Sequence, residues 1–101
     1  MITVKVTYGI KEEFVATNKK NIAAFMKDFI AMGTGFEYDV YTLDDETTFV
    51  HLSSYENEEI QHRVLNTPSF KEFQKQRDNS GLTKAHSVEV LTIVASSHKN
   101  L

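Results

Sequence analysis

Several side chains that can move a proton or hold an anion fall at alternating positions of predicted strands. His51 is a candidate general base, because an ordinary histidine has a pKa of about 6.5. Asp39 or Glu89 could orient its ring, Tyr41 could hydrogen-bond a substrate oxygen, and Lys5 could stabilise an enolate or phenolate. Together such groups can remove a proton from a phenol or an activated carbon and steady the anion that forms.

Each of these side chains also has a structural interpretation. A lone histidine on a strand is often a packed residue with no part in a reaction. Lys5 could form a cross-strand charge pair with Glu37, Asp39 or Glu89. Both interpretations stay open on the sequence.

Other motifs point away from thiol, metal and serine chemistry. The chain has no cysteine, which excludes disulfides and thiolate ligands. His86 and His98 have no partner at metal-ligand spacing, and the adjacent Asp44 and Asp45 are typical of a turn. No G-x-S-x-G motif is present. We therefore expect neither a metal nor a cofactor.

Length and composition indicate one compact globular domain, residues 1–101. The chain has 101 residues, 41% of them hydrophobic and 25% charged. A net charge of -3 disfavours nucleic-acid binding, which usually needs a basic surface. No apolar run is long enough for a signal peptide or a membrane span, and the lack of cysteine fits a reducing compartment. We expect a cytoplasmic protein without nucleic-acid or membrane partners.

Periodicity predicts the elements that position these residues. Alternation predicts strands over 2–8, 36–43, 47–54 and from 83 or 84 to 95. Three- and four-residue spacing predicts a helix over 11–32, stopped by Gly33, and a second helix that starts near Tyr55, breaks at Thr67-Pro68 and restarts. Residues 96–101 show no period and are expected to fray.

This order of elements predicts a ferredoxin-like βαββαβ fold of the α+β class, a four-stranded antiparallel sheet with both helices on one face. The side chains predicted to meet the helices are Ile2, Val4, Val6, Phe36, Tyr38, Val40, Val50, Leu52, Val88, Val90 and Val94. Those predicted on the open face are Thr3, Lys5, Thr7, Glu37, Asp39, Tyr41, Phe49, His51, Glu89, Leu91 and Ile93.

The predicted open face is too apolar for a monomer of this size. Phe49, Leu91, Ile93 and Tyr41 would lie on it together. A second copy of the chain would cover this face, since two-fold symmetry makes each patch its own complement. Lys5, Phe49, Glu89 and Leu91 are the candidate substrate-binding residues of the covered face.

One segment resembles a known family. The second helical region is similar to the broken second helix of the antibiotic biosynthesis monooxygenase-like proteins, members of the dimeric α+β barrel superfamily. The residues that carry the resemblance are His62, Leu65 and the segment from Asn66-Thr67-Pro68 to Phe73. The resemblance implies a homodimer whose pocket accepts small, mostly apolar or aromatic molecules. It also places His62 where a pocket histidine is found, although its spacing from Ile60 favours an exposed position or interface packing.

The same resemblance implies a range of activities. Some relatives oxygenate quinols or anthrones without flavin, metal or haem, and others cleave haem with the help of a tryptophan. This chain has no tryptophan, which disfavours haem cleavage. The leading hypothesis is a homodimeric, cofactor-independent monooxygenase for an aromatic or quinol substrate, with His51, Asp39, Tyr41 and His62 as catalytic candidates.

Two other functions stay open. The alternative is a non-catalytic homodimeric module that binds a ligand or another protein. An RNA-binding sheet would place aromatic side chains beside basic ones, but Glu37, Asp39 and Glu89 would repel phosphate.

Overall fold

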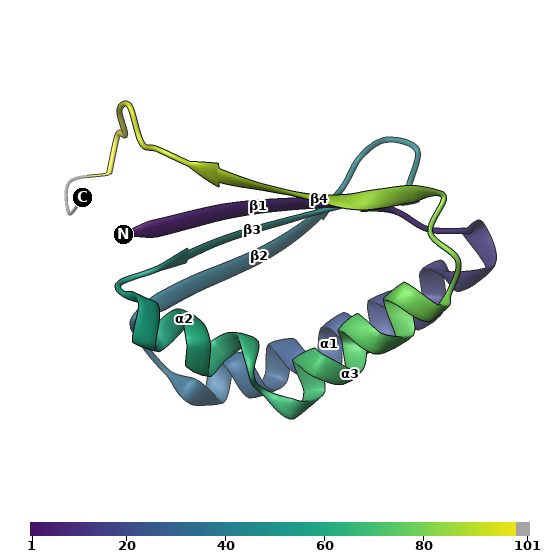
Figure 1. Cartoon of the computed structure of the whole chain (residues 1–101), viewed down its shortest axis with the longest axis horizontal. Coiled ribbons are helices and arrows are strands. Elements are labelled where there is room, and N and C mark those ends of the chain that lie inside the picture. The colour runs from purple at the N-terminus through teal and green to yellow at the C-terminus, as the bar shows by residue number, and fades with distance from the viewer. Residues whose placement is uncertain (99–101) are drawn as a thin grey trace.

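The computed structural model describes residues 1–98 and has a sheet with its α-helices on one face (Figure 1). The strands are β1 (Ile2–Gly9), β2 (Phe36–Thr42), β3 (Thr48–Tyr55) and β4 (Lys84–Leu91). They form one antiparallel four-stranded sheet in the order β2-β3-β1-β4. The helices are η1 (Glu12–Phe14), α1 (Val15–Met32), α2 (Glu58–Leu65) and α3 (Pro68–Asn79). The ferredoxin-like prediction is confirmed.

The first long helix begins later than its sequence pattern predicts. Residues 12–14 form a short 3-10 turn, and regular α-helix starts at Val15. The helix ends at Gly33, whose φ of 91° lies in the region that favours glycine. The predicted stop is therefore confirmed.

The second helical region is broken where the sequence predicts. Asn57 caps α2 through its side-chain oxygen, which accepts a 2.9 Å hydrogen bond from the Ile60 amide, so the helix starts after the predicted Tyr55. Thr67 has an extended backbone and Pro68 occupies the start of α3. Because Pro68 has no amide hydrogen to donate, α2 cannot run on through it.

The prediction for the faces of β3 was wrong. Direct partners on antiparallel strands share a face, and Phe49 lies opposite Tyr8 while His51 lies opposite Val6. The odd-numbered residues of β3 therefore face the helices, and Val50 and Leu52 face the open side. Phe49 and Tyr55 are each 1% exposed, and burying two large rings outweighs burying two smaller aliphatic side chains.

The prediction for the last strand was also wrong in part. β4 ends at Leu91 and does not reach residue 95. Val88, Val90 and Val94 are 59%, 74% and 98% exposed and do not meet the helices. The core cluster contains no β4 residue, because it draws on the helices and on the other three strands. The expectation of a frayed tail over 96–101 lies partly outside the described residues.

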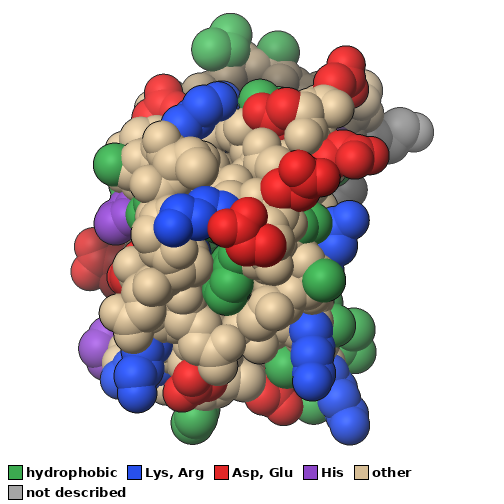
Figure 2. Space-filling view, turned by 90° about the vertical axis from the view of Figure 1, so that its right-hand side faces the viewer, with side chains coloured by type: hydrophobic (Ala, Val, Ile, Leu, Met, Phe, Trp, Pro, Cys, Tyr) green, Lys and Arg blue, Asp and Glu red, His purple; other side chains and the backbone are tan. Residues whose placement is uncertain are grey.

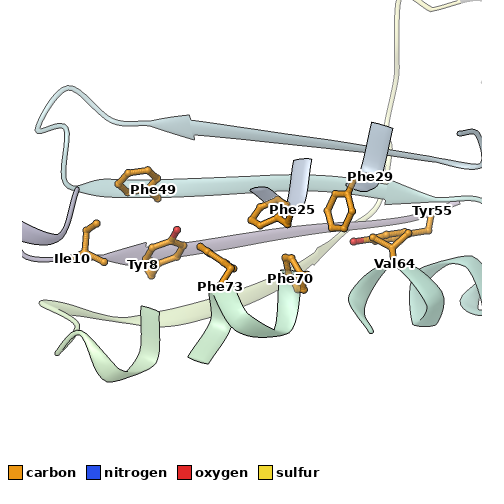
Figure 3. Packing of buried hydrophobic residues seen from close by; sticks show 9 residues of the cluster. All are labelled: Tyr8, Ile10, Phe25, Phe29, Phe49, Tyr55, Val64, Phe70 and Phe73. Atoms are coloured by element: carbon orange, nitrogen blue, oxygen red, sulfur yellow. The ribbon is translucent and has the colours of Figure 1, made fainter. Parts of the chain in front are cut away.

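The core is a continuous layer of aromatic rings between the sheet and the helices (Figure 3). Phe25 and Phe29 come from α1, and Phe70 and Phe73 from α3. The ring of Phe25 lies 5.0 Å from those of Phe29 and Phe73 and 5.1 Å from that of Phe70, measured between centroids. These separations are typical of favourable edge-to-face and tilted pairs.

The surface carries charges of both signs. Figure 2 shows the end of the molecule where η1 lies, and acidic and basic side chains are interspersed over it with small groups of hydrophobic ones. Within residues 1–98, no helix combines the length and the apolar character that a membrane crossing requires.

Replacing Phe25 by alanine should lower the free energy of unfolding by about 3–5 kcal/mol, because the cavity would remove ring contacts with both helices. Ile30→Ala on the same helix is the matched control, since Ile30 is 75% exposed. Urea unfolding followed by circular dichroism measures both variants, and equal losses would contradict the central position of Phe25.

Candidate active site

Three of the predicted site residues form one row across the open face. Strand pairing places Asp39 opposite Leu52, Leu52 opposite Lys5, and Lys5 opposite Glu89. Tyr41 lies in the next row and is 54% exposed. The structure thus brings Asp39, Lys5 and Glu89 together, with Tyr41 beside them.

Other predicted residues lie away from that row. His62 is exposed on α2, and its ring makes no hydrogen bond within residues 1–98. Leu91 ends β4 and is 39% exposed on the open face. Phe49 and His51 lie on the opposite side of the sheet, under the helices. The predicted constellation is therefore divided between two faces.

His51 is the centre of a buried network on the helix side. Its Nε2 lies 2.9 Å from the Tyr8 hydroxyl and its Nδ1 lies 2.8 Å from the Tyr38 hydroxyl. The side-chain amide of Asn18 donates a 2.9 Å hydrogen bond to the Tyr8 oxygen. We refer to Asn18, Tyr8, His51 and Tyr38 as the hydrogen-bonded chain. His51 is 2% exposed and Asn18 is fully buried.

A neutral imidazole has one donor and one acceptor, so the hydrogen-bonded chain can run in two directions. In one, Tyr8 donates to Nε2 and the Nδ1 hydrogen points to Tyr38. In the other, Tyr38 donates to Nδ1 and the Nε2 hydrogen points to Tyr8. A proton taken up at one phenol and released at the other converts one state into the other without leaving a charge on His51.

The surroundings keep these groups uncharged. Burial lowers the pKa of His51 to about 3, and the Arg77 guanidinium adds a smaller contribution in the same direction. Burial raises the pKa of Tyr8 to about 12, although the Asn18 hydrogen bond and Arg77 oppose the shift. Burial also raises the pKa of Tyr38 well above its usual range. All three rings are therefore neutral near pH 7.

Aromatic rings and one cation enclose the network. The His51 ring lies 5.3 Å from that of Phe73 and 6.3 Å from that of Phe25. The buried Arg77 guanidinium lies 5.3 Å from the centre of the Tyr8 ring, a cation-π arrangement. A weakly hydrated interior of this kind strengthens every electrostatic interaction inside it.

The sequence interpretation missed the partners of His51. Tyr38 was predicted to face the helices as an apolar residue, and neither its hydroxyl nor that of Tyr8 was given a role. Asn18 gave a usable signal, because it stands four residues before Ile22 and seven before Phe25 on the apolar stripe of α1. Its Oδ1 is the one buried side-chain polar atom without a partner in residues 1–98.

The surface of the described chain includes a larger and a smaller hollow. The larger, about 860 Å³, lies against the open face beside the segment after β4, and its lining includes Leu52, Ser54 and Ile93. The smaller, about 280 Å³, is lined by Lys19, Ile22, Val40, Tyr41, Thr42 and Phe49. We call it the α1–β2 groove. Within residues 1–98 no three His, Asp or Glu side chains gather as metal ligands would.

The buried His51 should make the fold less stable in mild acid. Its pKa is about 3 when folded, against 6.5 for an exposed histidine, so between these values the unfolded chain binds a proton that the folded chain does not. Stability should fall by about 1 kcal/mol on going from pH 7 to pH 5.5, and His51→Gln should lack this component. Urea unfolding at both pH values measures it.

The exposed His62 provides the control for that experiment. His62→Gln should retain the wild-type loss of stability between pH 7 and pH 5.5. An equal pH dependence in the wild type and in His51→Gln would contradict the burial of a neutral imidazole.

Comparison with solved structures supports the fold. A crystal structure of an antibiotic biosynthesis monooxygenase aligns with a TM-score of 0.81 at 14% identity, covering 94% of this chain and 100% of the other. A proposed enzyme of the same kind from Nitrosomonas europaea aligns with a TM-score of 0.80 at 14% identity, covering 94% and 100%. One from Deinococcus radiodurans gives 0.74 at 13% identity, covering 97% of each chain.

Sequence comparison supplies the family. A search of curated protein sequences found no match to this chain. The sequence model of the family described as antibiotic biosynthesis monooxygenase matches residues 1–76, which include β1 to β3, α1, α2 and most of α3. All four residues of the hydrogen-bonded chain lie inside that matched region. Because the family model matches most of the chain, the protein belongs to the antibiotic biosynthesis monooxygenase family.

Proposed function

We propose that the protein binds a small aromatic or quinol-type molecule and oxygenates it without a metal or an organic cofactor. One observation carries this proposal: an imidazole whose two nitrogens are both hydrogen-bonded to phenols, enclosed by aromatic rings. Membership of the family supports the reaction class. The hydrogen-bonded chain is the proposed proton-handling group.

The reaction needs little beyond proton transfer. A substrate with an acidic CH₂ beside a phenolic ring loses a proton to become a carbanion, which gives one electron to dioxygen. The substrate radical and the superoxide that result combine, and the peroxide anion takes up the proton to become a hydroperoxide. Loss of water from the peroxide leaves a carbonyl, so that CH₂ plus O₂ becomes C=O plus H₂O. This balance needs no outside reductant.

Tyr38 is the proposed contact with the substrate, because both nitrogens of His51 are already occupied and Tyr8 is fully buried. One phenol would accept the substrate proton while passing its own proton to the imidazole. The low pKa of His51 makes the imidazolium short-lived, so the proton returns readily for the formation of water. The aromatic walls keep bulk water from quenching the carbanion.

Removing either the Tyr38 hydroxyl or the His51 imidazole from the hydrogen-bonded chain should reduce turnover. With an anthrone and 1,4-naphthohydroquinone as probes, Tyr38→Phe and His51→Gln should each lower the rate of oxygen uptake by about 10²-fold or more. An oxygen electrode measures the rate, and product analysis by mass spectrometry shows the added oxygen atom.

Tyr55→Phe is the matched control, because Tyr55 is a buried tyrosine on the same face but outside the hydrogen-bonded chain. It should keep wild-type turnover. Loss of turnover in Asp39→Asn or Lys5→Gln with normal rates in Tyr38→Phe would instead place the site on the open face. Absence of oxygen uptake with every probe would leave the non-catalytic binding module.

A homodimer is the second part of the proposal, and the exposure of β4 favours it. Val88 and Val90 are exposed on the helix side, and Leu91 is exposed on the open side. β1 is the only strand that pairs with β4 within residues 1–98, so the outer edge is unpaired. An edge strand with hydrophobic side chains on both faces is a template for pairing with a second copy.

A charge on β4 should break this pairing. Wild-type protein is expected to be a dimer at micromolar concentration, and Val90→Lys is expected to be a monomer, because lysine on an edge strand opposes pairing. Ile30→Lys, on a helix surface that is equally exposed, should stay dimeric. Sedimentation equilibrium distinguishes the two states, and a wild-type monomer would refute the dimer.

A further inference from the structure

Asn18 is the inner end of the hydrogen-bonded chain. Its side-chain amide nitrogen donates to the Tyr8 oxygen over 2.9 Å, and the same oxygen lies 2.9 Å from His51 Nε2. Asn18 and Tyr8 are each 0% exposed, so solvent cannot take the place of either partner. Within residues 1–98 the Tyr8 hydroxyl therefore has two possible recipients for its hydrogen, His51 and Asn18.

The orientation of the Asn18 amide removes one of these recipients. An amide nitrogen donates and does not accept, so the Tyr8 hydrogen goes to His51 Nε2. The neutral imidazole then carries its own hydrogen on Nδ1, which donates to the Tyr38 oxygen. The Tyr38 hydrogen is left for a group outside the chain. We call this the outward direction, because every hydrogen points from Asn18 towards Tyr38 and beyond it.

The opposite, inward direction needs an acceptor at Asn18. When Tyr38 donates to Nδ1, the Nε2 hydrogen points to Tyr8, and the Tyr8 hydrogen has to point to Asn18. Asn18 Oδ1 can accept it, and this oxygen is the buried side-chain atom that has no partner within residues 1–98. A half-turn of the amide exchanges Oδ1 and Nδ2, since the last torsion of asparagine is broad and roughly two-fold. The unpaired oxygen is therefore the acceptor that the inward direction requires.

The two directions give Tyr38 two different abilities. In the outward direction its oxygen accepts a hydrogen bond from Nδ1, and its hydrogen is free to bind a substrate oxygen. In the inward direction its hydrogen points at Nδ1, so Tyr38 can pass that proton to His51 while it takes one from the substrate. The first direction suits binding, and the second suits proton removal.

We propose that Asn18 is a positioning residue that sets the direction of the hydrogen-bonded chain. With its amide nitrogen on Tyr8, it holds the resting protein in the outward direction, with the His51 hydrogen on Nδ1. With the amide turned, its oxygen allows the inward direction, in which Tyr38 removes the substrate proton. Only this second step rests on the proposed function, because the resting position of the His51 hydrogen requires no substrate.

Nitrogen-15 NMR of His51 tests the resting state without any turnover. A ring nitrogen that carries a hydrogen resonates far from one that does not, so the two shifts report where the hydrogen lies. Wild-type protein labelled at histidine should show this hydrogen mainly on Nδ1. A hydrogen mainly on Nε2 would overturn the assignment, because Asn18 would then be an acceptor in the resting protein.

Asn18→Leu removes the donor and the acceptor together and places an apolar side chain on the apolar stripe of α1. The Tyr8 hydrogen then has only Nε2 as recipient, so the His51 shifts should move further towards those of a ring with its hydrogen on Nδ1. The inward direction would leave the Tyr8 hydrogen unpaired, so kcat with the anthrone should fall by about 5- to 150-fold. KM should stay within about twofold, since the outward direction is kept. A shift of the hydrogen towards Nε2 would contradict the proposal.

Asn21→Leu is the matched control for this variant. It makes the same substitution on the same helix, where the Asn21 amide donates to Gln76 and lies outside the hydrogen-bonded chain. This variant should keep the wild-type His51 shifts, kcat and KM.

Asn18→Asp tests whether a donor and an acceptor at this position are sufficient. Burial favours the uncharged form of a carboxyl group, which has one O–H donor and a carbonyl acceptor, as the amide has both kinds of group. At about pH 6 this variant should recover most of the kcat that Asn18→Leu loses. Equal kcat values for Asn18→Asp and Asn18→Leu would show that the polar groups of Asn18 have no such role.

The outcomes separate this inference from the proposed function. Oxygen uptake with equal kcat in the wild type and in Asn18→Leu refutes the role of Asn18 alone. Absence of oxygen uptake with every probe refutes the oxygenase alone, because the His51 shifts of the wild type and of Asn18→Leu still decide the resting direction. If Asn18→Leu fails to fold, the wild-type shifts decide it without a variant.

Discussion

The hydrogen bonds that His51 makes through both ring nitrogens constrain much of the surrounding structure. A buried imidazole is tolerable only when its donor and its acceptor are both satisfied. The two partners come from different strands, Tyr8 from β1 and Tyr38 from β2, on either side of β3. A shift of one residue in β3 would move the ring to the opposite face and leave both phenols unpaired. The network therefore helps to fix the register of three strands.

The same network explains how polar chemistry can exist inside an aromatic core. Its members exchange hydrogen bonds while staying neutral, so no charge has to be kept in a medium that solvates charge poorly. Arg77, the one buried cation of the cluster, lies over ring faces and reaches Asp78, at 3.0 Å, on its outer side. Partial negative charge on a phenol oxygen would be stabilised by this guanidinium without a formal ion pair.

The fold was predictable from the sequence because its signals are local. A change of period at the ends of the strands, Gly33 and Thr67-Pro68 mark the elements, and their order admits few topologies. The acidic turn is equally local: Asp45 accepts hydrogen bonds from the Thr47 and Thr48 amides, as expected of a turn former.

The sequence could not predict which face of β3 points to the helices, because both faces carry apolar and polar side chains. The odd positions carry Phe49, His51, Ser53 and Tyr55, and the even positions carry Val50, Leu52 and Ser54. The aromatic face of β3 is the buried one because its large rings fill the space between the sheet and the helices. His51 meets Tyr8 and Tyr38 only when the odd-numbered residues of β3 face the helices. Because Val50 and Leu52 were predicted to face them instead, the sequence could not predict these hydrogen bonds.

The two edges of the sheet differ in a way that bears on how far the chain can assemble. The second half of β4 carries two exposed valines and one carboxylate, that of Glu89, whereas β2, at the other edge, carries the two carboxylates of Glu37 and Asp39. Charges on an edge strand discourage further pairing. If two copies paired through β4, only the two β2 edges would remain at the outside of the combined sheet. Because β2 carries two carboxylates, further copies would not add there, and the assembly would stop at a dimer.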